Sequence, residues 1–360
     1  MRPWEALVAS ASERTLSAGV IGLGAMGMNH ARVYGEIEGV ELAAVADPAP
    51  ERLIARPTLA RGVRTYADYR EMLGTEQLDL VSVAVPTGLH REVALAALER
   101  RVATLVEKPI AADLEDGRAI VRSAQEAGCP LMVGHVERFN PAVQELKRRL
   151  DAGHLGRVFL ARAERVGPFP QRTRDVGVVL DLATHDIDIL RFLLGCEVER
   201  VYAETATGLR TAHEDLLSAV MRFGGGVVGL LEVNWLTPAK VRRLALVGEK
   251  GMFVVDYLFQ ELLFYERESA GTAWPSLAAL TGGGEGAMTR IPIQKQEPLR
   301  AELEAFVESV AQGSPPPVPA EDARAAVEVA ARLVESGRTG QVVPVKARVT
   351  GRQTPVGGEG

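Results

Sequence analysis

Between residues 18 and 135 the sequence alternates short apolar runs with amphipathic segments, and this alternation restricts the fold more than any other feature. An unbroken apolar run indicates a strand buried on both faces, and such strands occur in parallel sheets covered by helices. The pattern therefore predicts a doubly wound α/β domain. Its strands are expected over 18–23, 40–47, 78–85, 102–108 and 130–135, and its helices over 25–37, 67–73, 90–101 and 114–128.

A different pattern follows residue 135. Helices are expected over 139–153 and 178–194, with a strand of alternating polar and apolar residues between them, over 157–167. Several strands then follow one another with short glycine turns, at 224–226 and 248–251, which indicates an open, mainly antiparallel sheet. These strands are expected over 198–206, 216–223, 227–236, 241–248, 252–257 and 261–266, followed by a loop over 268–290 and two closing helices over 298–313 and 320–337.

The length of 360 residues favours two domains over one core. We place a Rossmann domain at 18–134 and a second α/β domain at 135–345, with an N-terminal extension at 1–17 and a C-terminal tail at 346–360. The extension does not resemble a signal peptide, because its apolar stretch is short and contains Glu5 and Glu13. We interpret it as a partly disordered segment or as the result of a start codon assigned too early.

Composition excludes several classes of function. The net charge of −6 disfavours nucleic-acid binding, which needs a basic face, and the run Lys147 to Arg149 is interpreted as a solvated helix surface. No segment resembles a membrane span. The two cysteines, Cys129 and Cys196, are far apart, which favours a reducing, cytoplasmic location without disulfides. The six histidines show no metal-ligand spacing, so no metal is expected.

The sequence GLGAMG, residues 22–27, lies between the first predicted strand and the first predicted helix. In this context the G-x-G-x-x-G pattern indicates a dinucleotide site. Gly22 allows the tight turn, Gly24 lets a pyrophosphate approach the backbone, and Gly27 lets helix and strand pack closely. The helix start, with Ala25 and Met26, supplies N–H groups for the phosphates.

Asp47 ends the second predicted strand, twenty residues after Gly27. An acid at this distance accepts the hydroxyls of the adenosine ribose. Pro48 follows Asp47 where an arginine for a 2′-phosphate would be expected. The combination favours NAD over NADP.

Two further strand ends carry polar residues. Pro86, Thr87 and His90 follow the strand over 78–85, where they either line the cofactor or start a helix with Thr87 as N-cap. Glu107 and Lys108 end the strand over 102–108, which places the lysine near the nicotinamide end of the crevice, since ligands bind at the carboxyl ends of such strands.

The stretch VVLDLATHDID, residues 178–188, interrupts an apolar run with ionisable groups. On a helix, Asp181, His185 and Asp188 share one face, while Asp186 does not. By itself the pattern fits either a solvated polar stripe or a functional face.

Five motifs follow one another along the chain: GLGAMGMNHAR, VSVAVPTGLH, VEKPIA, VGHVERFNP and DLATHDID. Together they resemble the Gfo/Idh/MocA family of oxidoreductases over residues 18 to 345. The resemblance implies a Rossmann domain, and a C-terminal domain whose open sheet forms a homodimer or homotetramer interface. It also implies that Lys108, Asp181 and His185 are catalytic.

The implied activity is NAD-dependent oxidation of a sugar hydroxyl, with His185 as base and Lys108 assisting. The segments 167–188 and 234–257 are most similar to members that oxidise the 3-hydroxyl of UDP-N-acetylglucosamine, and Arg172 and Arg174 suit a diphosphate. Trp235 and Tyr257 are either sheet residues or sugar-stacking residues. The alternatives are a dehydrogenase of a free polyol or sugar such as inositol, a non-catalytic NAD-binding regulator, and a reductase of an imine or a tetrapyrrole on the same fold.

Overall fold

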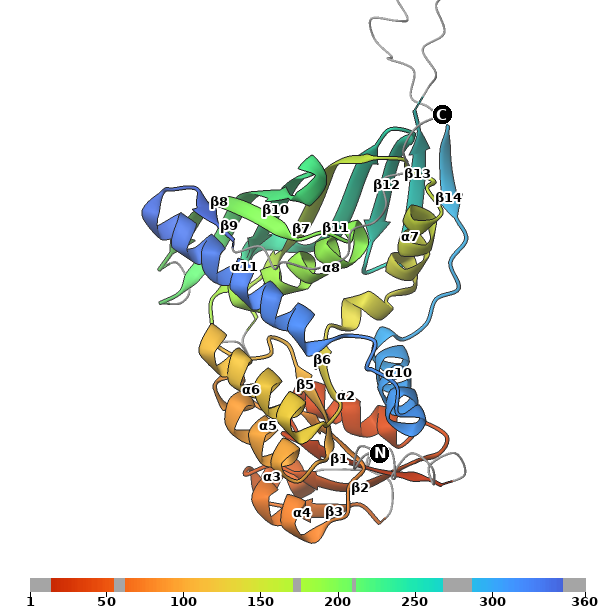
Figure 1. Ribbon diagram of the computed structural model, residues 1–360, viewed down its shortest axis with the longest axis vertical. Helices are drawn as coiled ribbons and strands as arrows, with labels where there is room; N and C mark the ends of the chain where they lie inside the picture. The colour runs from red at the N-terminus through yellow and green to blue at the C-terminus, as the bar shows by residue number, and fades with distance from the viewer. Residues whose placement is uncertain (1–13, 55–61, 171–175, 209–211, 268–286, 346–360) are drawn as a thin grey trace, which may run out of the picture.

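The computed structural model describes residues 14–54, 62–170, 176–208, 212–267 and 287–345. Its N-terminal half contains a six-stranded parallel sheet with the order β3-β2-β1-β4-β5-β6, as predicted for a doubly wound domain (Figure 1). The strands are β1 (Leu16–Ile21), β2 (Val40–Ala46), β3 (Arg64–Tyr66), β4 (Leu80–Val83), β5 (Ala103–Glu107) and β6 (Leu131–Gly134). The helices are α2 (Ala25–Tyr34), α3 (Pro50–Ile54), α4 (Tyr69–Thr75), α5 (His90–Glu99) and α6 (Leu114–Ala127).

The strand order reverses between β1 and β4, and this reversal determines where a ligand can bind. The loops that follow β1 and β4 leave the sheet in opposite directions, so a crevice opens at the carboxyl ends of the strands. The glycine-rich turn after β1, the loop after β4 and the Lys108 loop after β5 all lie at this edge.

The second sheet has nine strands in the order β14-β13-β12-β11-β7-β10-β9-β8-β15. All neighbouring pairs are antiparallel except β7 and β10, which are parallel, and both predicted glycine turns join antiparallel neighbours. The strands are β7 (Val158–Pro168), β8 (Val198–Thr207), β9 (Glu214–Phe223), β10 (Val228–Asn234), β11 (Leu236–Gly248), β12 (Gly251–Asp256), β13 (Glu261–Glu266), β14 (Met288–Ile291) and β15 (Val343–Pro344). β14 overlaps the end of the stretch that was expected to be a loop.

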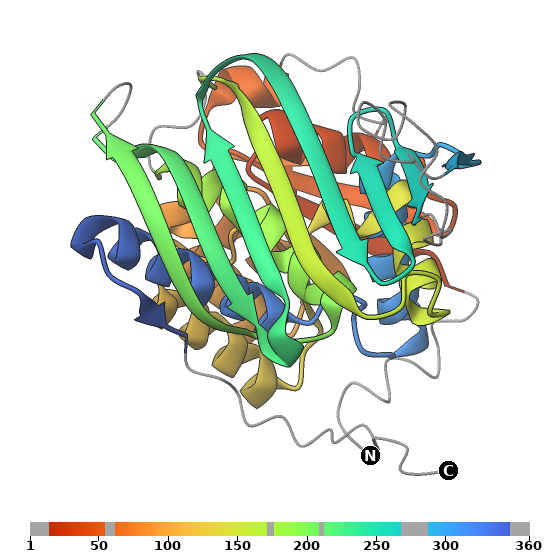
Figure 2. The same cartoon turned by 90° about the horizontal axis from the view of Figure 1, so that it is seen from above.

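In the described part of the chain, helices cover one face of this second sheet, the face toward the Rossmann domain (Figures 1 and 2). These helices are α7 (Pro141–Asp151), α8 (Thr184–Leu194) and α11 (Ala320–Thr339). A buried apolar cluster fills the space between them and the sheet. The final helices also contact the first domain, because α10 (Pro298–Gln312) packs against α2 and the start of α11 packs beside α6.

Four short helical segments complete the described chain: η2 (Thr87–Leu89), η3 (Val136–Phe139), η4 (Val179–Ala183) and η5 (Gly224–Gly226). η4 is a single π-helical turn that runs directly into α8, so the motif with Asp181 and His185 spans a change of helical pitch. Such turns are frequent at functional sites. Within the described ranges no helix has the length and apolar character needed to cross a membrane.

Candidate active site

The glycine-rich turn has the geometry that its sequence predicts. Gly22 has a φ of +88°, and a Cβ there would lie 2.6 Å from the carbonyl oxygen of Ala84. A Cβ on Gly27 would lie 1.8 Å from the carbonyl oxygen of Gly22. In contrast, a Cβ on Gly24 would meet nothing within 4 Å. The first and third glycines therefore keep the turn tight, while the second leaves its outer side open to a ligand.

The open side of the turn is also the start of α2. Gly24 is the N-cap and no side chain caps the helix, so the N–H groups of its first turn have no side-chain acceptor. Ala25 is exposed and Met26 is half-buried at this end. Free N–H groups beside an open backbone fit the pyrophosphate of NAD.

Asp47 lies next to the turn, at the end of β2. Its Oδ2 accepts a hydrogen bond from the Leu23 N–H at 2.6 Å, and its Oδ1 accepts one from the Ala49 N–H at 2.9 Å. Arg52, on α3, extends across the carboxylate with Nη1 3.2 Å from Oδ2. Sequence reasoning missed this arginine. Its side chain is 52% exposed, so it can turn outward to leave the carboxylate to the ribose hydroxyls.

We predict that Asp47→Ala weakens NAD binding by roughly ten- to a hundredfold, because hydrogen bonds to a charged group are lost. Arg52→Ala should leave the affinity nearly unchanged or raise it. Titration of NAD by calorimetry measures both. An Asp47→Ala protein with wild-type affinity would contradict the ribose assignment.

The loops after β4 and β5 are joined through His90. Its Nδ1 and Nε2 each lie 2.9 Å from a main-chain oxygen, of Pro109 and Val85 respectively, and the residue is buried. The side chain therefore bridges the two loops. Because burial lowers the pKa of His90, the neutral ring donates its one N–H to one of these two oxygens. Pro86 is exposed and Thr87 is half-buried at the start of η2, where the structure gives Thr87 no N-cap hydrogen bond.

Glu107 is buried at the end of β5 and is held from two sides. Its Oε1 lies 2.9 Å from Nε2 of His30, and its Oε2 accepts the Lys108 N–H at 3.1 Å. Burial by itself raises the pKa of Glu107, but the hydrogen bond and charge of His30 outweigh burial and lower it. A fixed carboxylate therefore holds the backbone from which Lys108 projects. The Lys108–Pro109 peptide bond is cis.

Lys108 and Asp181 connect the two halves of the molecule. The Nζ of Lys108 donates to the main-chain oxygen of Asp181 at 2.8 Å and to its Oδ1 at 3.0 Å. The two side chains are 15% and 17% exposed. This contact places the end of β5 against the π-helical turn before α8, so residues that are 73 positions apart meet in one crevice.

His185, in the first turn of α8, lies in the same region. It is 9% exposed, and its Nδ1 is buried without a hydrogen-bond partner among the described residues. Burial lowers the pKa of His185 well below 6.5, and the positive charges of Lys108 and Arg165 lower it further. The imidazole is consequently neutral at pH 7 and able to accept a proton.

This lowered pKa predicts the pH dependence of catalysis. A base with a depressed pKa stays unprotonated as the pH falls through 6.5, so kcat/KM should remain flat from about pH 8 to 6.5 and decrease only below that. A pH profile of kcat/KM provides the test. If kcat/KM instead falls on the acid side with an apparent pKa at or above 6.5, then His185 with a lowered pKa is not the base.

A buried set of ion pairs, which sequence reasoning missed, supports α8 from beneath. Arg165 on β7 donates to both oxygens of Asp186, at 2.7 and 3.1 Å, and to Glu137 at 2.9 Å. Arg138 donates to both oxygens of Asp188, at 2.7 and 2.6 Å. Asp186 and Asp188 thus hold α8 in place and do not face solvent.

The remaining predicted residues lie elsewhere. Trp235 and Tyr257 are buried in the core of the second domain, where Trp235 packs edge-on against Phe169 and Tyr257 lies under Arg165. Arg172 and Arg174 fall outside the described residues. In the described part of the chain, no group of three or more metal-binding side chains is present.

Comparison with known proteins places this geometry in context. Residues 16–135 match the family model described as an oxidoreductase family with an NAD-binding Rossmann fold, and residues 143–254 match the GFO/IDH/MocA C-terminal domain. UDP-N-acetylglucosamine 3-dehydrogenase of Acidithiobacillus ferrooxidans is 32% identical over 83% of this chain and 90% of that protein. Inositol 2-dehydrogenase 2 of Saccharopolyspora erythraea is 31% identical over 92% of this chain and 96% of that protein.

Solved structures of related dehydrogenases superpose on this chain over nearly its whole length. The UDP-N-acetylglucosamine 3-dehydrogenase of Acidithiobacillus ferrooxidans superposes with a TM-score of 0.78 at 28% identity, covering 91% of this chain and 99% of that one. The WlbA dehydrogenase of Bordetella pertussis, solved with NADH and UDP-GlcNAcA, gives a TM-score of 0.78 at 25% identity, covering 93% and 100%.

Proposed function

Because the chain belongs to the Gfo/Idh/MocA family of NAD-dependent oxidoreductases, we propose that it oxidises C3 of UDP-N-acetylglucosamine to the 3-keto sugar. The observation that carries the proposal is the contact between Lys108 and Asp181 beside a neutral His185. A cation and a base that meet in one crevice are the two groups needed to remove the proton from a hydroxyl.

In the proposed mechanism His185 removes the proton of the substrate hydroxyl. Lys108 donates a hydrogen bond to the same oxygen and stabilises the negative charge that develops on it. Asp181 holds the ammonium group of Lys108 in position through the 3.0 Å contact. NAD, when bound, supplies the hydride acceptor.

Similarity to known proteins favours a nucleotide sugar as the substrate. Among curated relatives, the UDP-N-acetylglucosamine 3-dehydrogenase matches over most of both chains, and a solved relative holds a UDP-sugar. The second candidate is a free polyol, favoured by inositol 2-dehydrogenases of similar identity and coverage. The two candidates differ in one chemical feature, since only the first carries a nucleoside diphosphate.

The test compares kcat/KM for UDP-N-acetylglucosamine, N-acetylglucosamine and myo-inositol with NAD, and then adds UDP as a competitor. The proposal expects the UDP-sugar to be the best of the three and UDP to compete with it. Turnover of myo-inositol with no effect of UDP would favour the polyol. NAD binding without turnover of any sugar would favour a non-catalytic NAD-binding protein.

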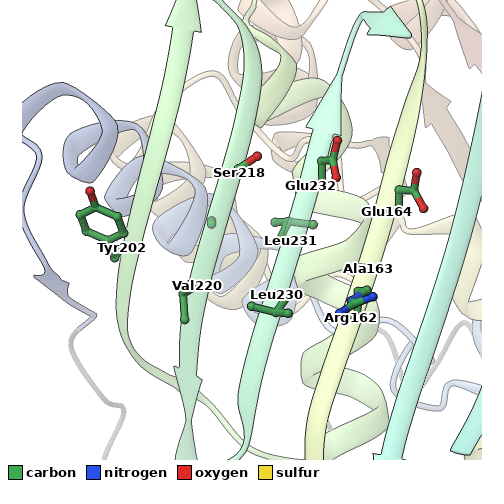
Figure 3. A pocket seen from close by; sticks show the side chains of 10 residues that line it. Arg162, Ala163, Glu164, Tyr202, Ser218, Val220, Leu230, Leu231 and Glu232 are labelled. Atoms are coloured by element: carbon green, nitrogen blue, oxygen red, sulfur yellow. The ribbon is translucent and has the colours of Figure 1, made fainter. Parts of the chain in front are cut away.

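We also propose that the chain forms a homodimer or homotetramer through the outer face of the nine-stranded sheet. No helix of the described chain covers this face (Figure 2). Across it, Val220, Leu230 and Arg162 lie side by side in register, and Val220 is 46% exposed. They line a shallow hollow of about 480 Å³ together with Ser218, Glu232 and Glu164 (Figure 3).

A charge at the centre of this face should disrupt the assembly. Val220→Lys is expected to shift the protein to the monomer, because an unpaired charge would be buried between subunits. Light scattering after size-exclusion chromatography measures the mass. Val334→Lys, at an exposed position of α11, is the matched control. A Val220→Lys protein with the wild-type mass would exclude this face.

A further inference from the structure

Arg242, on β11, faces the same side of the sheet as the catalytic helix. It lies directly opposite Arg165 of β7 in the antiparallel register, so both side chains project toward α8. Its neighbour Arg243 projects to the opposite face and is 62% exposed, whereas the Arg242 side chain is 26% exposed. Arg242 is therefore a partly buried cation on the inner side of the second domain.

The charge of Arg242 is incompletely paired. Among the described residues, its contact with a carboxylate is to Oε1 of Glu137, at 3.5 Å from Nη1. The same oxygen already accepts a hydrogen bond from Arg165 at 2.9 Å, and Arg165 also donates to both carboxylate oxygens of Asp186. Within the described residues, no side-chain hydrogen bond of Arg242 is present. Arg165 and the partly buried Arg242 thus share Oε1 of Glu137, which lies closer to Arg165.

Arg242 also lies within electrostatic reach of the proposed catalytic groups. Burial lowers its pKa, and the charge of Arg165 lowers it further, while Asp181 opposes this. In turn the charge of Arg242 contributes to the low pKa of His185. The guanidinium of Arg242 therefore has donors without a hydrogen-bond partner among the described residues, on the face of the sheet that α8 covers.

We propose that Arg242 binds an anionic group of the substrate, a carboxylate or phosphate, on the inner side of the second domain. The proposal rests on the proposed function, because it uses the same crevice. A planar guanidinium donates two parallel hydrogen bonds to a carboxylate or phosphate, and such an anion would supply the acceptors that Glu137 provides only at 3.5 Å. Arg242 would then select charged sugars over neutral ones.

Competition binding tests this with the wild-type protein, without requiring turnover. The NADH-bound protein is titrated with two matched pairs, D-glucuronate against D-glucose and UDP against uridine, while the fluorescence of NADH is followed. Tighter binding of either anion than of its neutral partner supports the proposal, and the pair that responds identifies carboxylate or phosphate. Equal binding within both pairs would overturn it.

A variant then assigns the effect to the residue. Arg242→Met should weaken binding of the responding anion by roughly ten- to a hundredfold and leave its neutral partner unchanged. Arg242→Lys should retain part of the affinity, and Arg243→Met, which loses the same charge on the opposite face, should behave as wild type. Suppose instead that Arg242→Met binds the anion normally, and that only the apparent pKa on the acid side of the kcat/KM profile rises. The proposal would then be wrong, and Arg242 would act only by lowering the pKa of His185. If no sugar is turned over but the anion preference is present, the proposed function fails and this inference stands.

Discussion

Alanine at His185 or at Lys108 is expected to slow NAD-dependent sugar oxidation by about two to four orders of magnitude. In the proposed mechanism His185 is the base, and Lys108 is the cation that reaches the π-helical turn from the other domain. Each replacement removes one of the two groups that act on the substrate oxygen. Steady-state kcat with the best sugar measures the loss.

Two controls separate catalysis from folding. His154→Ala and Lys147→Ala change the same residue types on the surface and should keep wild-type turnover. The His185 and Lys108 variants should also keep the wild-type circular dichroism, because neither side chain belongs to the apolar clusters of the core. Wild-type rates in either active-site variant would remove that residue from the mechanism.

Methionine at Arg165 is expected to lower the free energy of unfolding by about 3–5 kcal/mol, the largest stability effect that we predict. Arg165 is 1% exposed and pairs with Asp186, which is fully buried, and with Glu137. Without it, two carboxylates remain in the interior without their principal cation.

The loss should depend on pH in a defined direction. Burial already raises the pKa of Asp186, although Arg165 opposes that increase. Removing Arg165 raises this pKa further, so the folded variant takes up a proton more readily than the unfolded chain. The destabilisation should be larger at about pH 7 than at about pH 5.

Urea unfolding followed by tryptophan fluorescence measures this effect, with Arg243→Met as the exposed control, expected within about 0.5 kcal/mol of wild type. A small, pH-independent change in Arg165→Met would show that the buried carboxylates do not depend on this arginine.

Sequence periodicity was sufficient for the elements that have enough residues to show a period. The long helices and the buried strands of the first sheet agree with their predicted ranges. α3, β3 and β14 were missed because each has only three to five residues. The parallel pairing of β7 with β10 was also missed. Short turns predict pairing only between neighbours in sequence, whereas α8, β8 and β9 lie between β7 and β10 along the chain.

The site was predictable where a local motif carries it. The glycine turn and the Asp181–His185 spacing are visible in the sequence because the chemistry depends on neighbours along the chain. Arg165 and Arg242 gave no such signal. Each lies on a strand with alternating residues, where an arginine ordinarily faces solvent. Arg165 is buried because Glu137 of η3 and Asp186 of α8 pair with it, and Arg242 is partly buried beside Glu137.

The most direct test of the account is a single-turnover measurement. The wild-type protein, saturated with NAD, is mixed with a panel of UDP-sugars and polyols, and the absorbance of reduced nicotinamide is recorded. The account predicts a rise with at least one sugar, which Lys108→Ala and His185→Ala abolish or slow severely. A flat signal with every sugar, in a protein that binds NAD, would contradict it.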